Sequence, residues 1–481
     1  MKPVLFFLFF LLSLAAIAEE PIDYSKLKVD ELFNTLCATC HGEQLDQGLG
    51  GSLVDGVWKH GSSDEEITAS IKEGNPELGM TPFGTVLNDE QIRSLVIYIR
   101  EKEFEAKNQA TEFPRPEPGK VTQTQYADYQ IETFVEDGLE LPWAIAFLPD
   151  GRKLVTERPG RLRLIEADGS LQEAPILETP PVIAHGQGGM MEVAVHPDFI
   201  ENGWIYLAYA DGWREPAEEE GKKGRAKTIT KVVRGRITEG RWTDEETIWQ
   251  SPREFYTSDG VHFGTRIVFQ DGYIYFIVGE RNGKMEVQDL ANPKGKIYRL
   301  HDDGRIPEDG PFVDRDEALD GIWTYGHRNP QGLALHPVTG ELFSTEHGPR
   351  GGDELNLIEP GNNYGWPVIT HGMNYDGTPM TSETAREGME QPLIHWTPSL
   401  AVCGLDFYTG SAFPGWENDL FAGALRKEEV RRLRLEKGKV IEQEVILKNL
   451  GRVRDVATGP DGYLYILLNK PDSILRLVPT P

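Results

Sequence analysis

Residues 326–349, GHRNPQGLALHPVTGELFSTEHGP, contain the unit from which most of the chain is built. A polar segment leads into a short apolar strand at Gly332–Leu335, a turn at Pro337–Gly340 and a second strand at Glu341–Ser344. Two antiparallel strands joined by a tight turn bring their outer ends together. We therefore expect Arg328-Asn329 to lie beside His347-Gly348-Pro349 at one edge of a sheet.

The same unit recurs six times from about Tyr129 to the end of the chain. Its first strands are Trp143–Phe147, Glu192–His196, Arg266–Phe269, Gly332–Leu335, Gly404–Phe407 and Asp455–Thr458. Each copy adds a strand of its own kind, at Leu162–Ile165, Val233–Ile237, Ile297–Leu300, Leu355–Ile358, Val430–Leu435 and Ile474–Leu477. Six such copies predict an all-β six-bladed β-propeller over residues 125–481. Six unrelated hairpins in a sandwich are the alternative, which the regular order of strand types disfavours.

A propeller brings particular residues together at one mouth of its central channel. The first strand of each blade lies next to the axis, so the residues before it and after the second strand surround the mouth. The positions nominated in this way include Gln187, His262, Arg328, Asn329, His347, Gly348, Pro349, Arg426, Arg452 and Arg454. Several arginines in one cleft favour a polyanionic ligand, because guanidinium groups match carboxylates bidentately. His262 is the natural general base, and we expect Arg158 and Arg281 to pair with Glu157 and Glu280.

The first residues of the chain predict its cellular location, and its net charge excludes some classes of partner. Residues 1–18 have a basic residue, an apolar run and the Ala16-Ile17-Ala18 cleavage pattern of a signal peptide, and the run is short for a membrane span. We therefore expect a periplasmic protein that is not integral to the membrane. A net charge of -28 argues against nucleic acid or an anionic membrane surface as a partner.

Residues 22–107 form a small all-α unit that carries Cys37-Ala-Thr-Cys40-His41. Three helices are predicted, over about Val29–Cys37, after Ser63 with Glu66 as a capping box, and after Asn88. Cys-x-x-Cys-His is the attachment motif of c-type haem, with both thiols joined to the porphyrin and the His on the iron. A disulfide does not need the adjoining His, and a zinc site lacks a second ligand pair, so haem is the favoured interpretation.

The sixth iron ligand and the domain boundary complete this part of the prediction. Met80 lies in a Gly/Pro-containing loop between the second and third helices, and we favour it over His60 because Met/His ligation suits electron transfer. The unit resembles the class I cytochrome c domain over its whole length. Residues 108–124 carry three prolines without apolar periodicity and are predicted to be a semi-extended linker.

The propeller region resembles the soluble PQQ-dependent glucose and aldose sugar dehydrogenases. The resemblance rests on motifs in the same order: Gly326–Gly332, Gly348-Pro349 with Asp353–Asn356, Asn363–Pro367, Gly415–Asn418 and Arg452–Asp455. It implies that His262 takes the proton from the anomeric hydroxyl of an aldose while hydride passes to PQQ. It implies also that Arg328 stabilises the charge developing on the PQQ carbonyl oxygen.

The resemblance further implies how the cofactors are held. Gln187, Asn329, Arg426, Arg452 and Arg454 match the positions that bind the PQQ carboxylates. The backbone carbonyls of Gly348 and Pro349 match ligands of the Ca²⁺ beside PQQ, and Asp353, Glu354 and Tyr364 match a second, structural Ca²⁺ site through side chains or carbonyls. Arg426 stands where Lys is usual, His347 replaces a Gln, and Val261 precedes the base where an Asp is found, which puts the sugar preference in doubt.

These expectations combine into one function with two alternatives. The quinohaemoprotein passes electrons from the sugar through PQQ to its own haem and then to a downstream acceptor. The first alternative is a propeller that binds a glycan or a protein beside a separate cytochrome. The second is a metal-dependent lactonase, which needs acidic ligands on the axis where this chain has Arg and His. Cys403 remains as a buried apolar residue without a partner.

Overall fold

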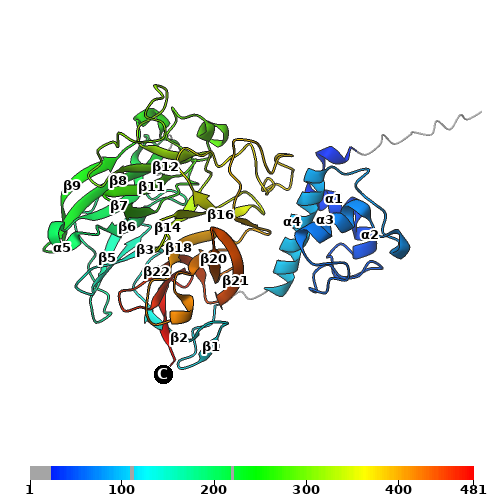
Figure 1. The fold of residues 1–481 in the computed structure, drawn as a ribbon, viewed down its shortest axis with the longest axis horizontal. Helices are drawn as coiled ribbons and strands as arrows, with labels where there is room; N and C mark the ends of the chain where they lie inside the picture. The colour runs from blue at the N-terminus through cyan, green and yellow to red at the C-terminus, as the bar shows by residue number, and fades with distance from the viewer. Residues whose placement is uncertain (1–22, 109–112, 218–221, 481) are drawn as a thin grey trace, which may run out of the picture.

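The computed structural model describes residues 23–108, 113–217 and 222–480. Figure 1 shows a small helical unit beside a larger unit made of sheets, with helix α4 on the side of the small unit that faces the sheets. Within the described residues, no helix is long and apolar enough to cross a membrane.

The small unit contains the three predicted helices and one more. Its elements are η1 (Tyr24–Lys26), α1 (Val29–Leu36), α2 (Ala38–His41), α3 (Asp64–Glu73), η2 (Pro76–Leu78) and α4 (Asp89–Lys107). The predicted capping box is present at α3, where Ser63 and Glu66 satisfy each other's backbone amides. The haem motif begins at Cys37, the residue between α1 and α2, and its other residues form α2. Apolar residues of α1, α3 and α4 make one core, including Phe33, Ile67 and Ile92.

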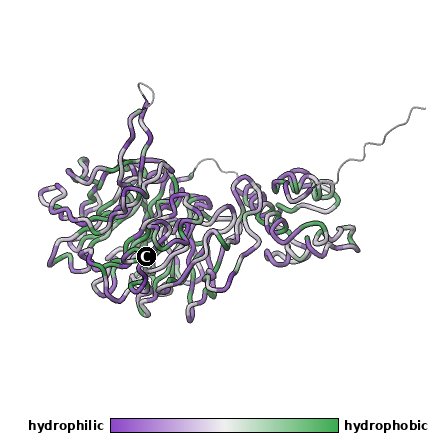
Figure 2. Tube along the Cα trace, turned by 90° about the horizontal axis from the view of Figure 1, so that it is seen from above, coloured by the Kyte–Doolittle hydropathy of each residue, from purple (hydrophilic) through white to green (hydrophobic). Residues whose placement is uncertain are grey.

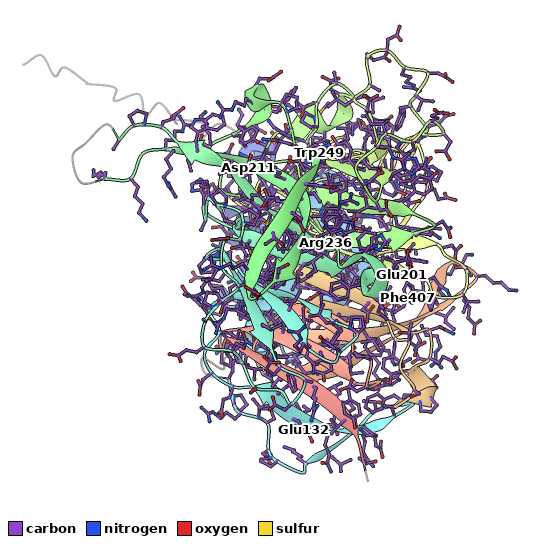
Figure 3. The ribbon with its side chains drawn as sticks, turned by 90° about the vertical axis from the view of Figure 1, so that its left-hand side faces the viewer. Glu132, Glu201, Asp211, Arg236, Trp249 and Phe407 are labelled. Atoms are coloured by element: carbon purple, nitrogen blue, oxygen red, sulfur yellow. The ribbon has the colours of Figure 1, made fainter. Side chains whose placement is uncertain are left out.

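The large unit is the predicted six-bladed propeller, with six separate antiparallel sheets. The first three blades contain β3 (Pro142–Phe147), β4 (Lys153–Glu157) and β5 (Arg161–Ile165); β6 (Met190–Val195), α5 (Phe199–Asn202), β7 (Ile205–Arg214), β8 (Ala226–Thr238) and β9 (Arg241–Trp249); and, after η3 (Arg253–Phe255), β10 (Ile267–Gln270), β11 (Tyr273–Val278), η4 (Lys284–Gln288), β12 (Lys296–His301) and β13 (Ile322–Tyr325). Figure 3 looks onto the second of these blades, with Trp249 labelled on the edge strand β9 and Arg236 on β8.

The remaining blades close the ring. They contain β14 (Pro330–Leu335), β15 (Leu342–Glu346), β16 (Asp353–Ile358) and β17 (Ile394–Trp396); β18 (Val402–Phe407), η5 (Pro414–Trp416), β19 (Leu420–Ala424), β20 (Glu429–Glu436) and β21 (Lys439–Lys448); and β22 (Arg452–Thr458), β23 (Leu464–Asn469) and β24 (Ser473–Pro479). The sixth sheet also receives β2 (Asp128–Val135) and β1 (Val121–Gln123) from the start of the unit. The two ends of the propeller are thereby joined by strand pairing, and the last residues of the predicted linker are a strand.

The interior of the propeller holds both apolar layers and a buried ion network. Figure 2 shows hydrophobic stretches mostly inside the larger unit and hydrophilic stretches toward its periphery. Near the axis, Arg266 donates to Glu192 at 2.9 Å and lies 3.0 Å from Asp455. These three buried side chains belong to β6, to the approach to β10 and to β22, so the network ties three blades together. Breaking one partner leaves an uncompensated buried charge, which is strongly destabilising.

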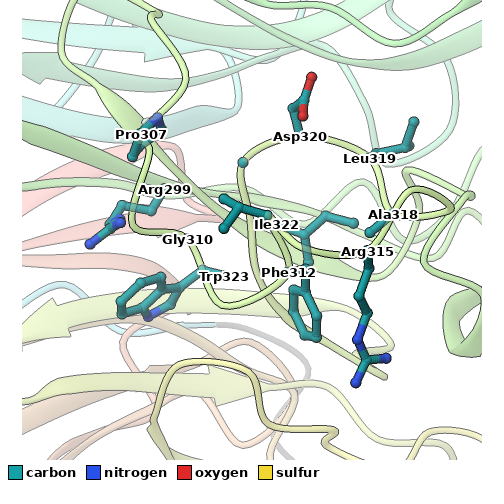
Figure 4. Close-up of a pocket in the computed structure, with 12 residues that line it drawn as sticks. Arg299, Pro307, Gly310, Phe312, Arg315, Ala318, Leu319, Asp320, Ile322 and Trp323 are labelled. Atoms are coloured by element: carbon teal, nitrogen blue, oxygen red, sulfur yellow. The ribbon is translucent and has the colours of Figure 1, made fainter.

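A small, partly open pocket lies on the outer part of the third blade. Its lining comes from β12, β13 and the segment between them, and includes Arg299, Phe312 and Trp323 (Figure 4). The interior of about 40 Å³ has room for a few water molecules and is too small for a sugar. It lies apart from the channel mouth at which the predicted site residues meet.

Candidate active site

His262 and Glu280 form a buried pair at the channel mouth. His262 Nδ1 lies 2.8 Å from Glu280 Oε1, and Glu280 Oε2 accepts hydrogen bonds from Trp366 Nε1 at 2.8 Å and from the Lys284 backbone amide at 2.7 Å. Burial lowers the pKa of His262, and the Glu280 hydrogen bond opposes that shift. Burial raises the pKa of Glu280, but the hydrogen bond from His262 and other contacts lower it overall, so the carboxylate stays ionised. The pair therefore keeps a neutral imidazole oriented through Nδ1, with Nε2 available as a base.

Arg328 lies beside this pair and is held by the second strand of its own blade. Its Nε is 4.0 Å from Glu280 Oε1, and Nη1 donates to the His347 carbonyl at 2.9 Å. The buried Glu346 accepts from the backbone amides of Arg328 and Asn329 and from His327. The His347 amide donates to the Asn329 carbonyl at 3.1 Å. The two polar segments of the opening sequence therefore lie side by side, as their hairpin predicted.

Most of the residues predicted to bind the PQQ carboxylates lie together at the channel mouth, and Arg426 lies apart from them. Gln187 Oε1 accepts from the His262 amide at 2.9 Å, and Asn329 Oδ1 accepts from the Gly264 amide at 3.0 Å. Arg454 donates to Gln331 at 3.1 Å and to the Cys403 thiol at 3.2 Å. These residues all contact the approach to β10 or the start of β18 and β22, so the fold brings them to one mouth.

Arg454 is a half-buried cation whose hydrogen-bond partners are neutral. Burial lowers its pKa, and the charges of Arg266 and Arg452 act in the same direction. Its hydrogen-bond partners Gln331, Cys403 and Asn469 carry no negative charge in their usual forms. An arginine whose side chain has only neutral hydrogen-bond partners fits an anionic cofactor, because a guanidinium binds carboxylates well. Cys403 is buried as expected, although its thiol contacts Arg454 instead of apolar groups alone.

Arg426 lies at a different place from these residues. Its Nη1 donates to Glu101 of α4 at 3.0 Å, and its side chain is 38% exposed. The structure therefore turns this predicted cofactor ligand toward the small helical unit. Arg452 lies near Arg454 and Glu428, whose pKa values its charge affects.

The predicted calcium ligands form two groups. The Pro349 carbonyl accepts from Ser399 Oγ at 3.1 Å, and Gly348 precedes it in the same turn, which Asp353 holds by accepting from the Gly348 amide at 3.1 Å. In the described residues there is no cluster of three or more His, Cys, Asp or Glu side chains suited to a metal. Calcium ligation here therefore needs backbone carbonyls, which Ca²⁺ accepts readily.

Asp353, Glu354 and Tyr364 do not present three side chains to one point. Asp353 and Glu354 are adjacent in β16, so their carboxylates point to opposite faces of the sheet. Glu354 lies directly opposite Glu346 in the β15–β16 ladder, and burial together with that neighbouring charge raises the pKa of Glu354 to about 8. Two like charges at opposed positions destabilise a sheet, so this pair fits a bound cation. The Tyr364 hydroxyl donates to the Leu357 carbonyl at 2.6 Å, which leaves its backbone carbonyl as the possible ligand.

His41 of the haem motif is oriented as an iron ligand would be. His41 Nδ1 lies 3.2 Å from the Gly51 carbonyl, which places the hydrogen on Nδ1 and leaves Nε2 for a metal. A Cβ on Gly50 would lie 2.6 Å from the imidazole, so a larger residue there would displace the ring. Cys37 and Cys40 form no disulfide with each other, so both thiols remain for haem attachment. Met80 packs against the same core as Cys37, whereas His60 is exposed and contacts Asn75.

Two expected ion pairs are absent, and the true partner of the base was missed. Arg281 is buried with its guanidinium on the carbonyls of Val261, Asp259 and Thr228, and Glu280 binds His262 instead. Arg158 donates to the Gly186 carbonyl at 2.9 Å, while Glu157 binds Arg161 and Arg163. The side chains of adjacent residues just after a strand point to opposite sides. The sequence order of Glu280 and Arg281 therefore does not show that only Glu280 faces the channel.

The fold and the site define a propeller oxidoreductase joined to a cytochrome c-like domain. The sequence profile of the Glucose / Sorbosone dehydrogenase family matches residues 139–476, and that of Cytochrome C oxidase, cbb3-type, subunit III matches residues 27–99. The chain therefore belongs to the glucose/sorbosone dehydrogenase family. It is a sugar dehydrogenase that carries its own cytochrome c domain.

Individual relatives agree with this assignment. The aldose sugar dehydrogenase YliI of Escherichia coli (strain K12) is 43% identical over 352 residues, which is 72% of this chain and 91% of that protein. The crystal structure of the soluble E. coli aldose sugar dehydrogenase in the apo-form has a TM-score of 0.67 at 41% identity and covers 73% of this chain and 99% of that one. The PQQ-bound aldose sugar dehydrogenase of Streptomyces coelicolor has a TM-score of 0.58 at 25% identity, with 76% and 99% covered.

Proposed function

We propose that this protein oxidises the anomeric hydroxyl of aldose sugars to lactones with PQQ and Ca²⁺, and passes the electrons to its own c-type haem in the periplasm. One observation carries the proposal: the buried His262–Glu280 pair lies beside Arg328 at a channel mouth where Arg454 has neutral partners. The PQQ-bound relative from S. coelicolor supports the choice of cofactor.

His262 is the general base in this proposal. Its neutral imidazole accepts the proton of the sugar hydroxyl at Nε2 while Nδ1–H stays hydrogen-bonded to Glu280, whose negative charge stabilises the imidazolium that forms. Trp366 and the Lys284 amide fix the Glu280 carboxylate, so the imidazole is oriented before the sugar arrives. His347 does not compete as a base, because burial lowers its pKa to about 3 and its Nε2 contacts the Val402 carbonyl.

Other residues hold the cofactor and the charge that develops on it. PQQ supplies the carbonyl carbon that accepts hydride when it is bound. Arg328 presents a buried guanidinium, one of whose nitrogens has no hydrogen-bond partner, to stabilise negative charge at that position. Gln187, Asn329, Arg426, Arg452 and Arg454 hold the carboxylates, and the carbonyls of Gly348 and Pro349 bind Ca²⁺. Asp353, Glu354 and Tyr364 hold the second Ca²⁺, with Glu354 as the side-chain ligand.

The cytochrome domain supplies the electron acceptor. Cys37 and Cys40 would attach the haem, and His41 Nε2 and Met80 would bind its iron. Residues 1–18 lie outside the described residues, and their sequence supports export to the periplasm. An external redox protein or a quinone-linked chain then accepts the electrons.

The test combines the haem spectrum with additions to the exported protein. Oxidised protein is mixed with PQQ, Ca²⁺ and a panel of aldoses, and haem reduction is followed. We expect reduction that requires all three additions. Sugar-dependent reduction of an artificial dye without haem reduction would remove the internal electron path. If the protein reduces neither its haem nor the dye, although the haem is intact and the propeller is folded, the proposal is refuted and a binding module is favoured.

A further inference from the structure

Helix α4 has two buried faces, only one of which belongs to the core of its own domain. Ile92, Leu95, Val96 and Ile99 pack against α1 and α3. Arg93, Ile97 and Glu101 recur every fourth residue and so share another face. Both Ile97 and Glu101 are nearly inaccessible to solvent, at 1% and 3% exposed. A charged residue buried on a second face of a helix indicates that a partner surface covers that face.

The partner surface is the cofactor side of the propeller. Glu101 Oε2 accepts from Arg350 Nε at 2.7 Å, and Glu101 Oε1 accepts from Arg426 Nη1 at 3.0 Å. Arg350 directly follows the Gly348-Pro349 turn. Glu101 therefore binds two loops of the propeller, one at Arg350 and one at Arg426. Both loops contain residues proposed to hold the cofactor or its metal.

Apolar and cation–π contacts extend this strip along α4. Ile97 packs so closely on Gly351 that a Cβ there would come within 2.7 Å of its side chain. Met373 of the propeller is buried within the core of the cytochrome domain. Lys427 Nζ lies 3.2 Å from the centroid of the Phe104 ring. The strip Arg93, Ile97, Glu101 and Phe104 thus faces the propeller along most of the helix.

The docked arrangement has a consequence for the haem motif. Figure 1 shows α4 between the propeller and the rest of the cytochrome domain, with α2 on the far side. Cys40 and His41 lie in α2. The helix that carries the haem motif therefore lies on the side of its domain away from the propeller.

We propose that the α4 strip is a docking surface for the cofactor loops of the propeller, and that Glu101 takes the place of a cofactor carboxylate on Arg426. This inference rests on the proposed function. A cofactor carboxylate would have to share the Arg426 guanidinium with Glu101, and the two carboxylates would repel each other. An anionic cofactor and the docked helix compete, so cofactor binding releases the cytochrome domain to present its haem to the cleft.

Competition is reciprocal, which makes the proposal measurable from either side. The probe is PQQ with Ca²⁺, titrated by equilibrium dialysis into full-length, haem-loaded protein, while small-angle X-ray scattering reports docking. We expect Glu101→Gln to bind PQQ tighter, on the order of 10-fold, and to scatter as an extended particle before PQQ is added. Wild-type protein should change from compact to extended as PQQ binds.

Two further variants separate charge from docking. Glu103→Gln is the matched control, because Glu103 pairs with Arg100 and Lys107 within α4 and should leave both readouts at the wild-type values. Phe104→Ala keeps the Glu101 charge but removes the Lys427 contact, so it should also raise PQQ affinity if docking competes. The haem spectrum shows that each variant retains a folded cytochrome domain.

The outcomes are distinct. Unchanged or weaker PQQ binding by Glu101→Gln, or a wild-type scattering curve that PQQ leaves unchanged, overturns the competition while the proposed function stands. A wild-type protein that binds no PQQ refutes the proposed function itself, and this inference with it.

Discussion

Replacing Glu280 by Gln tests the centre of the proposed mechanism. The substitution keeps the size of the side chain and removes its charge. One oxygen of Glu280 faces His262 Nδ1 at 2.8 Å, and the other accepts from Trp366 and from the Lys284 amide. The Gln oxygen can serve only one of these two sides. The Gln amide nitrogen, itself a donor, then faces either His262 Nδ1 or the two donors Trp366 Nε1 and the Lys284 backbone amide.

The expected loss follows from these contacts. A hydrogen bond to a charged group contributes about 1.5–3 kcal/mol, and each 1.36 kcal/mol is tenfold in rate. We therefore expect kcat/KM to fall about 10- to 150-fold, because the imidazolium formed with the proton from the sugar loses its stabilising charge. The unfolding free energy should fall by about 1–3 kcal/mol for the unpaired donors.

The pH profile gives a second, independent reading. His262 works as a base when it is neutral, so activity rises as pH increases through its pKa. Glu280 raises that pKa against the effect of burial. Glu280→Gln should therefore move the acidic limb of kcat/KM to lower pH while lowering the plateau.

The assay is dye reduction by the protein loaded with PQQ and Ca²⁺ over a range of pH. Glu286→Gln is the matched control, since Glu286 binds Lys294 and Asn292 in the next loop. The reasoning is refuted if the kcat/KM plateau of Glu280→Gln equals that of the wild type, or if the acidic limb of its pH profile moves to higher pH.

Three more predictions address the other groups. Arg328→Lys loses the planar fork beside Glu280 and should lower kcat by about 100-fold; single-turnover kinetics check this, and an unchanged kcat excludes the role. Met80→Ala should alter the visible spectrum of the ferric haem and lower its potential, whereas His60→Ala, at an exposed position, should change neither; the reverse result makes His60 the ligand. Chelation of Ca²⁺ should lower the Tm of the wild type, because the half-buried Glu354 carboxylate then lies opposite Glu346 without a cation and has to take up a proton. Glu354→Gln should reduce that response, and equal losses in calorimetry contradict the site.

Local pattern was sufficient for most of the architecture. Alternating apolar strands separated by Pro/Asp/Gly turns predicted the hairpin at residues 326–349 and its copies, because strand period and turn chemistry are properties of a few neighbouring residues. The capping box at Ser63 and Glu66 predicted the start of α3 for the same reason. The pairing of β2 with β24 joins the two ends of the propeller, and no local pattern indicated it.

The candidate site was predictable as a set of positions and not as a set of contacts. Each blade places the residue before its first strand at the channel mouth, so His262, Arg328 and Arg454 could be nominated from spacing. Which carboxylate meets His262 depends on how the segments before β10 and after β11 turn at the mouth of their shared blade. The sequence suggested that Glu280 would pair with Arg281, and the fold turned the two apart.

By itself, therefore, the sequence determined the two units, the blades and the residue types that gather at the mouth, since these follow from local periodicity and from repetition. Tertiary structure alone decided the pairing of Glu280 with His262 and the packing of α4 on the propeller. Glu101 lies 249 residues from Arg350 and 325 from Arg426 along the chain. Contacts over such separations depend on how complete domains pack against each other, and no pattern within either segment records that packing.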